Sequence, residues 1–198
     1  MAFITPHELL DIGVMTLILG FLFKDTFRPT PTYSDDPLKA FKKPRTKWKN
    51  FLFATAIIAP SIIIHELAHK FTAMGYGLDA TFHAFYANPT TLVIGAIAIA
   101  ARLLGSGLVL LIPGYVHVLG EATAGQHALI AFAGPAVHLL FWIGGKAYLH
   151  FKKKLTERQR QFATLTANVN GLLLILNMLP IPGVDGYAVY TNLIQALA

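Results

Sequence analysis

The chain alternates between long apolar runs and shorter polar connections. A helix rises about 1.5 Å per residue, so about 20 apolar residues cross the roughly 30 Å hydrocarbon layer of a bilayer. The main apolar runs cover about residues 9–23, 51–74, 129–149 and 162–181. Before the first run, Pro6 and Glu8 are typical of a helix start. The pattern therefore predicts several membrane-spanning helices.

The middle of the chain is less regular. Its apolar part, residues 92–112, is interrupted by Arg102 and Gly105. A charge flanked by glycine predicts two half-elements that fold back rather than one span. Residues 108–118 (LVLLIPGYVHV) are β-branched and apolar around a Pro-Gly turn, which predicts a short hairpin. In the last part of the sequence, apolar residues at helical spacing predict a short amphipathic helix over about 187–197.

The predicted fold class is a polytopic α-helical membrane protein. We expect about five or six transmembrane helices, together with a short membrane-embedded β-hairpin or re-entrant segment. Apolar residues make up 55% of the chain and charged residues 13%, against about 45–50% and about 25% in soluble domains. The absence of cysteine excludes a disulfide scaffold. We expect a multi-pass protein of the cell membrane, surrounded by the lipid bilayer.

Positive charge is concentrated in two segments between apolar runs. Residues 24–50 and 146–160 each carry a net charge of +5, within a total of +6. Membrane proteins place lysine and arginine in such loops, whereas nucleic-acid binders interleave them with exposed aromatics. We therefore expect no nucleic-acid partner. If residues 92–112 do not cross, both segments lie on one side of the membrane; if they cross, the charge rule does not decide the orientation.

A metal-binding pattern lies inside the second apolar run. Residues 65–69 read HELAH, and four residues make about one helical turn, so His65 and His69 share a face and can bind one metal ion. Glu66 is rotated by about 100° and can reach a metal-bound water without being a ligand. The preceding fourteen residues carry no charge, and ionisable groups at such depth are costly and usually functional. The pattern predicts a metal site.

A third protein ligand is needed, because catalytic zinc takes three and keeps one position open. Asp185 is the best candidate. It lies in NMLPIPGVDG (177–186), where prolines and glycines end a helix and free backbone groups that only a cavity can accommodate inside a membrane. A zinc ion and the carboxylates of Asp185 and Glu66 sum to zero charge, which lowers the cost of burying them. Asp11 and Asp79 are weaker rivals in polar contexts.

Three motifs together resemble the site-2 proteases, the intramembrane zinc metalloproteases. They are HELAHKF at 65–71, AGPAVHLL at 133–140 and NMLPIPGVDG at 177–186. Their order and spacing cover the chain from about Phe51 onwards. The resemblance implies one zinc ion per chain, with His65, His69 and Asp185 as its ligands. It implies that Glu66 is the catalytic base.

Two further residues are candidates for a role in catalysis. The family's Gly-Pro-x-x motif frequently ends in asparagine, and this chain has His138 there. His138 could donate a hydrogen bond to the substrate or the oxyanion, or it could simply pack, and both interpretations stay open. Asn177 is a second candidate neutral donor for the oxyanion. The segment LIPGYVHV at 111–118 resembles the family's membrane-embedded β-hairpin, which engages substrate.

We expect a single intramembrane metalloprotease domain over residues 1–198. It comprises an N-terminal helix (1–23), a basic linker (24–50) and a catalytic core (51–198). The basic segment 146–160 is too short for a PDZ domain, so none is expected. The expected reaction is hydrolysis of peptide bonds within or near transmembrane segments of substrate proteins, by a zinc-activated water.

Two other classes of function stay open. The first is a metal transporter or metal sensor, in which the ligands would form a transit site with further histidines. His83, His117 and His127 are available for such a path. The second is a catalytically inert, protease-like scaffold that binds partner helices. The intact HELAH pattern argues against the scaffold, because an inert protein has no need of it.

Overall fold

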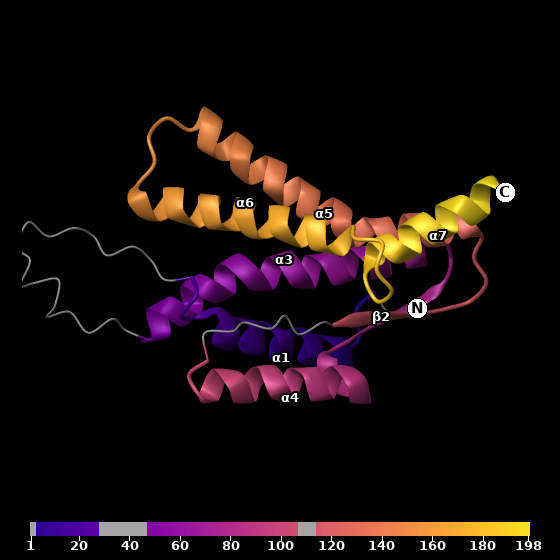
Figure 1. Cartoon of the computed structure of the whole chain (residues 1–198), viewed down its shortest axis with the longest axis horizontal. Coiled ribbons are helices and arrows are strands. Elements are labelled where there is room, and N and C mark those ends of the chain that lie inside the picture. The colour runs from indigo at the N-terminus through magenta and orange to yellow at the C-terminus, as the bar shows by residue number, and fades with distance from the viewer. Residues whose placement is uncertain (1–2, 28–46, 107–113) are drawn as a thin grey trace, which may run out of the picture.

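A computed structural model describes residues 3–27, 47–106 and 114–198. Within them are α-helices, a short 3-10 helix and two strands. In chain order these are α1 (Pro6–Phe23), α3 (Lys47–Gly75), β1 (Asp79–His83), η1 (Phe85–Ala87), α4 (Pro89–Leu103), β2 (Tyr115–Leu119), α5 (Ala124–Phe151), α6 (Glu157–Asn177) and α7 (Asp185–Leu197). Helix α3 lies between α1 on one side and α5 on the other, and α6 packs along α5 (Figure 1).

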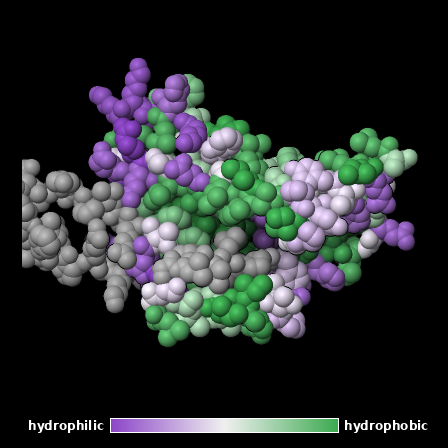
Figure 2. Space-filling view, viewed as in Figure 1, coloured by the Kyte–Doolittle hydropathy of each residue, from purple (hydrophilic) through white to green (hydrophobic). Residues whose placement is uncertain are grey.

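Three of the described helices are long and apolar enough to cross a membrane. They are α1, α3 from Trp48 onwards, and α5. Figure 2 shows hydrophobic residues over the middle of the molecule and hydrophilic residues near the α5–α6 connection. The chain is a membrane protein, but the expected five or six spans are not confirmed. Helix α4 has 15 residues, about 22 Å, and α6 starts with the polar sequence Glu-Arg-Gln-Arg.

The described parts of the two basic segments lie at one end of the molecule. Figure 1 shows the start of α3 and the α5–α6 connection at the end opposite the sheet and α7. The sequence left two arrangements open, and this placement matches the one in which both basic segments lie on the same side. The predicted interruption within 92–112 is also present, because α4 ends at Leu103. There the N–H groups of Gly105 and Ser106 donate to carbonyls of the last turn.

The predicted hairpin over 108–118 falls partly on residues 107–113, which lie outside the described residues, so its turn and first strand stay a prediction. Its described part forms β2, which pairs with β1 in antiparallel register, with Phe82 opposite Val116. The reason is a shared apolar face. Phe82 and Val116 belong to the main core against α1 and α3, while Val118 packs on a smaller cluster that includes Ile130. Burial of that face favours pairing between strands that are distant in the sequence.

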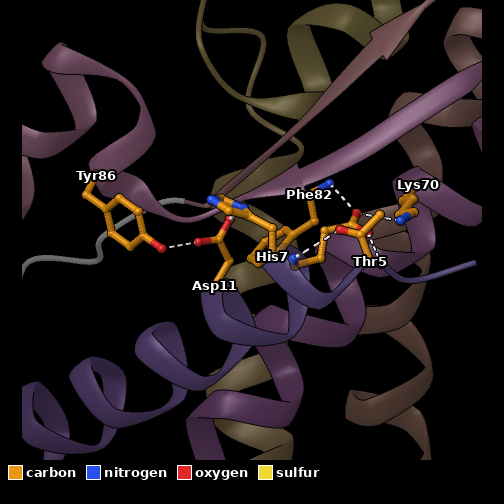
Figure 3. Close-up of polar contacts among 7 residues, drawn as sticks. Thr5, His7, Asp11, Lys70, Phe82 and Tyr86 are labelled. Carbon is orange, nitrogen blue, oxygen red and sulfur yellow. Dashed lines mark hydrogen bonds and ion pairs between the residues drawn. The ribbon is translucent and has the colours of Figure 1, made fainter. Parts of the chain in front are cut away.

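A buried ion pair joins the start of α1 to α3. Lys70, which follows His69 directly, donates to Glu8, and both side chains are almost completely buried. The same carboxylate accepts the Phe82 N–H of β1 (2.8 Å) and the Thr5 N–H (2.8 Å), as Figure 3 shows. Removing one partner of such a pair costs about 3–5 kcal/mol, because it leaves an uncompensated buried charge. Glu8 therefore holds α1, β1 and α3 together beside the HELAH turn.

Candidate metal centre

His65 and His69 lie one turn apart on α3, and their Nε2 atoms are 3.1 Å apart. The Nδ1 atom of His69 donates to the carbonyl oxygen of Ile130 on α5 (2.7 Å). A carbonyl can only accept, so this bond leaves the proton on Nδ1 and a free lone pair on Nε2. Metal-bound histidines in proteins are oriented in this way.

Asp185 meets the two histidines from α7, of which it is the first residue. Its Oδ2 lies 3.2 Å from His65 Nε2, and its Oδ1 lies 3.5 Å from His69 Nε2. Gly186 permits this placement, because a Cβ there would lie 2.5 Å from the Met178 backbone. The carboxylate oxygens of Asp185 thus face both imidazole nitrogens, and the ionised carboxylate is the form that binds metals.

The donor set fits a zinc ion. Four ligands placed tetrahedrally at about 2.0–2.1 Å from zinc are about 3.3 Å from one another. Here the two histidine Nε2 atoms are 3.1 Å apart, and they lie 3.2 and 3.5 Å from the two carboxylate oxygens of Asp185. The Oδ2 atom of Asp185 is buried without a hydrogen-bond partner, which a metal ion would satisfy. Two imidazoles and one carboxylate leave one tetrahedral position open for water or substrate.

The remaining sequence candidates occupy different positions. Glu66 is buried next to His65 on α3. Of the rival carboxylates, Asp79 is exposed at the start of β1, and Asp11 lies beside His7 and Tyr86. Neither rival is among the residues that meet His65 and His69 within the described chain.

His138 on α5 is buried next to the histidine pair. Its ring stacks on the ring of His65, with centroids 4.6 Å apart. Its Nδ1 atom donates to Asn170 on α6 (2.9 Å), and Asn170 in turn donates to Ser61 (2.9 Å). These contacts favour packing and positioning over contact with substrate. Asn177 ends α6, and none of the contacts found among the described residues joins it to the centre, so its oxyanion role stays a prediction.

Several residues that shape this centre were not identified from the sequence. Gly134 of α5 packs closely against both histidines. A Cβ at this position would lie 2.3 Å from His69 Nε2 and 2.5 Å from His65 Cε1. The small residues around it in AGPA were the available signal. Asn170 gave a weaker signal, as an amide inside an apolar run. The Ile130 carbonyl gave none, because every residue has one.

The fold and the centre define a membrane protein in which two histidines on a helix of membrane-spanning length meet an aspartate from α7. The chain is 34% identical over 145 residues to "Putative zinc metalloprotease Rip2" of Mycobacterium tuberculosis, in two strains, across 65% of this chain and 52% of the relative. It therefore spans about half the length of Rip2. It is 25% identical over 187 residues to "Putative zinc metalloprotease MJ0611" of Methanocaldococcus jannaschii, across 92% of this chain and 82% of the relative.

These relatives support the resemblance to site-2 proteases that the three motifs indicate. No protein-family profile matches the chain. No solved structure matches it either.

Proposed function

We propose that the protein is an intramembrane zinc metalloprotease of the site-2 type. It hydrolyses peptide bonds within or near transmembrane segments of substrate proteins, as a single-domain, multi-pass protein of the cell membrane. The observation that carries the proposal is that His65 and His69 on α3 meet Asp185 on α7. Glu66 is buried next to His65 on α3. The relatives are named as zinc metalloproteases, which supports the coarser part of the proposal, a zinc-dependent protease.

The roles of the residues follow from their chemistry. When bound, zinc lowers the pKa of a water and polarises the peptide carbonyl. Glu66 takes the proton of the attacking water and returns it to the leaving amine. His69 keeps its orientation through the Ile130 carbonyl, and His65 keeps its orientation against the His138 ring. The burial of this turn excludes bulk water, which strengthens the electrostatic interactions within it.

Within the described residues, the sheet has an edge that could take an extended substrate. The Phe82 N–H donates to Glu8, so Phe82 and Val116 form a pair that is not hydrogen-bonded to one another. By the alternation of an antiparallel ladder, Val116 and Val118 direct their N–H and C=O groups away from β1. At the outer edge of β1, Glu8 accepts the Phe82 N–H, whereas no strand among the described residues pairs with the outer edge of β2. A peptide added there is extended, and its carbonyls are free of helical hydrogen bonds.

Replacing Val118 by proline is expected to lower kcat/KM for a peptide substrate by about 5- to 10-fold. The substitution removes one outward N–H, and a lost hydrogen bond is worth about 1 kcal/mol. Proline is tolerated at edge positions whose N–H faces outward. Val118→Ala is the matched control, because it trims the side chain and keeps the N–H. Equal cleavage by the two variants would show that substrate does not pair with this edge.

Metal dependence tests the proposed function directly. Purified protein in detergent is incubated with a panel of synthetic transmembrane peptides, and cleavage is followed by mass spectrometry. Chelation is expected to stop cleavage, and added zinc to restore it, because the activated water depends on the ion. Cleavage that persists after complete zinc removal contradicts the proposal. Binding of zinc without cleavage of any peptide would favour the transporter or sensor class.

A further inference from the structure

A second cluster of metal-ligating side chains lies where α1 meets β1. His7 and Asp11 are one turn apart on α1, and His83 ends β1. One ligand atom from each lies within 4.8 Å of the others. His7 Nδ1 is 3.4 Å from Asp11 Oδ2, and Figure 3 shows the two side chains turned toward one another. The donors match those of the first centre: two imidazoles and a carboxylate.

Two atoms of this cluster are buried and have no hydrogen-bond partner. Asp11 is 0% exposed; its Oδ1 accepts the hydroxyl of Tyr86, whereas its Oδ2 accepts no hydrogen bond. His83 Nδ1 is likewise buried and unpaired. Beyond its 3.4 Å contact with His7 Nδ1, Asp11 Oδ2 thus has no partner among the described residues. Polar atoms without a hydrogen bond are costly out of water, and such groups normally have one. A cation placed between the two atoms would satisfy both.

We propose that His7, Asp11 and His83 bind a second divalent transition-metal ion, of the zinc or cobalt class. Two nitrogens and one oxygen suit these ions, whereas magnesium and calcium prefer all-oxygen sites. Tyr86 holds the Asp11 carboxylate in place through its other oxygen, as outer hydrogen bonds do for metal ligands. The side chain of His7 is 64% exposed, so the ion can exchange with solvent. The ion would tie α1 to β1, the strand that pairs with β2.

Zinc content tests this site separately from the first centre. The full chain is purified in detergent without a polyhistidine tag, dialysed against zinc, and analysed for metal. We expect about two ions per chain, one for each three-ligand group, where the motifs alone imply one. His7→Ala should bind about one, and so should the double variant His65→Ala/His69→Ala. The matched control His127→Ala, which removes an exposed histidine of α5, should keep about two.

A second measurement covers the case in which the double variant folds poorly. Zinc should raise the Tm of any variant that retains a site, since an ion that binds only the folded state stabilises it. His83→Ala should lose the same ion as His7→Ala. Cobalt bound to the double variant should give visible ligand-field absorption that disappears when His7→Ala is added.

The outcomes separate this proposal from the proposed function. If His7→Ala binds as much zinc as the unaltered chain, the cluster is only a His-Asp pair, and this inference is overturned while the first centre stands. If the double variant keeps all the zinc and His7→Ala loses it, the first centre fails and the present site stands. Loss of one ion in each supports both.

Discussion

Replacing Glu66 by glutamine is expected to abolish peptide cleavage while the chain still binds zinc at its first centre. Glutamine has nearly the shape of glutamate but cannot accept the proton of the attacking water, and loss of a general base costs about 10²- to 10⁴-fold in rate. Glu66 is not one of the three converging ligands, so the affinity for zinc should change little. The two readouts are the cleavage rate and the zinc content of the same preparation.

The matched control is Asp79→Asn, which neutralises an exposed carboxylate at the start of β1 and should leave the cleavage rate unchanged. Two results would contradict the assigned role of Glu66. One is a Glu66→Gln preparation that cleaves at the full rate. The other is loss of zinc in that variant, which would make Glu66 a ligand rather than a base.

Replacing Gly134 by alanine is expected to weaken zinc binding at the first centre by about 100-fold, and to abolish cleavage with it. The added Cβ would lie 2.3 Å from the Nε2 atom that His69 offers to the metal. Either the ring or helix α5 must move. The Ile130 carbonyl that orients His69 lies on α5, so its hydrogen bond is disturbed as well. Changes of this kind around a ligand cost about 10- to 100-fold in metal affinity.

The same helix supplies a close control. Gly144→Ala makes the identical chemical change in α5, at a position where an added Cβ has nothing within 4 Å. Alanine is favoured over glycine within a helix by about 1 kcal/mol, so Gly144→Ala should keep its zinc and unfold at the same or a higher temperature. Equal zinc affinity in the two variants would show that Gly134 is not in close contact with the two histidines.

The parts of the site that could be predicted are those with a local signal. His65 and His69 are one helical turn apart, so their common face follows from helix geometry alone. Asp185 could be proposed because a helix that ends at prolines and glycines inside a membrane frees backbone groups. Only a cavity can accommodate such groups there. The structure brings these three residues together, as the sequence predicted. The amphipathic C-terminal helix is also confirmed, as α7.

The parts that could not be predicted depend on contacts between distant segments. Apolar alternation predicted a strand in β2, but many apolar segments could have paired with it. The choice of β1 depends on the shared core beneath the sheet. The contact of His138 with Asn170 and the approach of His83 to His7 join separate elements, and no spacing rule connects such positions. The expected number of spans is not confirmed, because α4 has only 15 residues and α6 starts with a polar sequence.

The pairing of Glu8 with Lys70 has a consequence for biosynthesis. Helix α1 leaves the ribosome before α3, so the acidic partner is already present when Lys70 has to enter the membrane. Lys70 lies near the end of α3, where a lone lysine costs less to insert than at a helix centre, where the cost is about 2.5–3.5 kcal/mol. The Glu8 carboxylate beside it offsets part of that cost. We therefore expect α1 to lower the cost of inserting α3, the helix that carries His65 and His69. A chain translated from an internal start codon after α1 would have to insert that lysine alone.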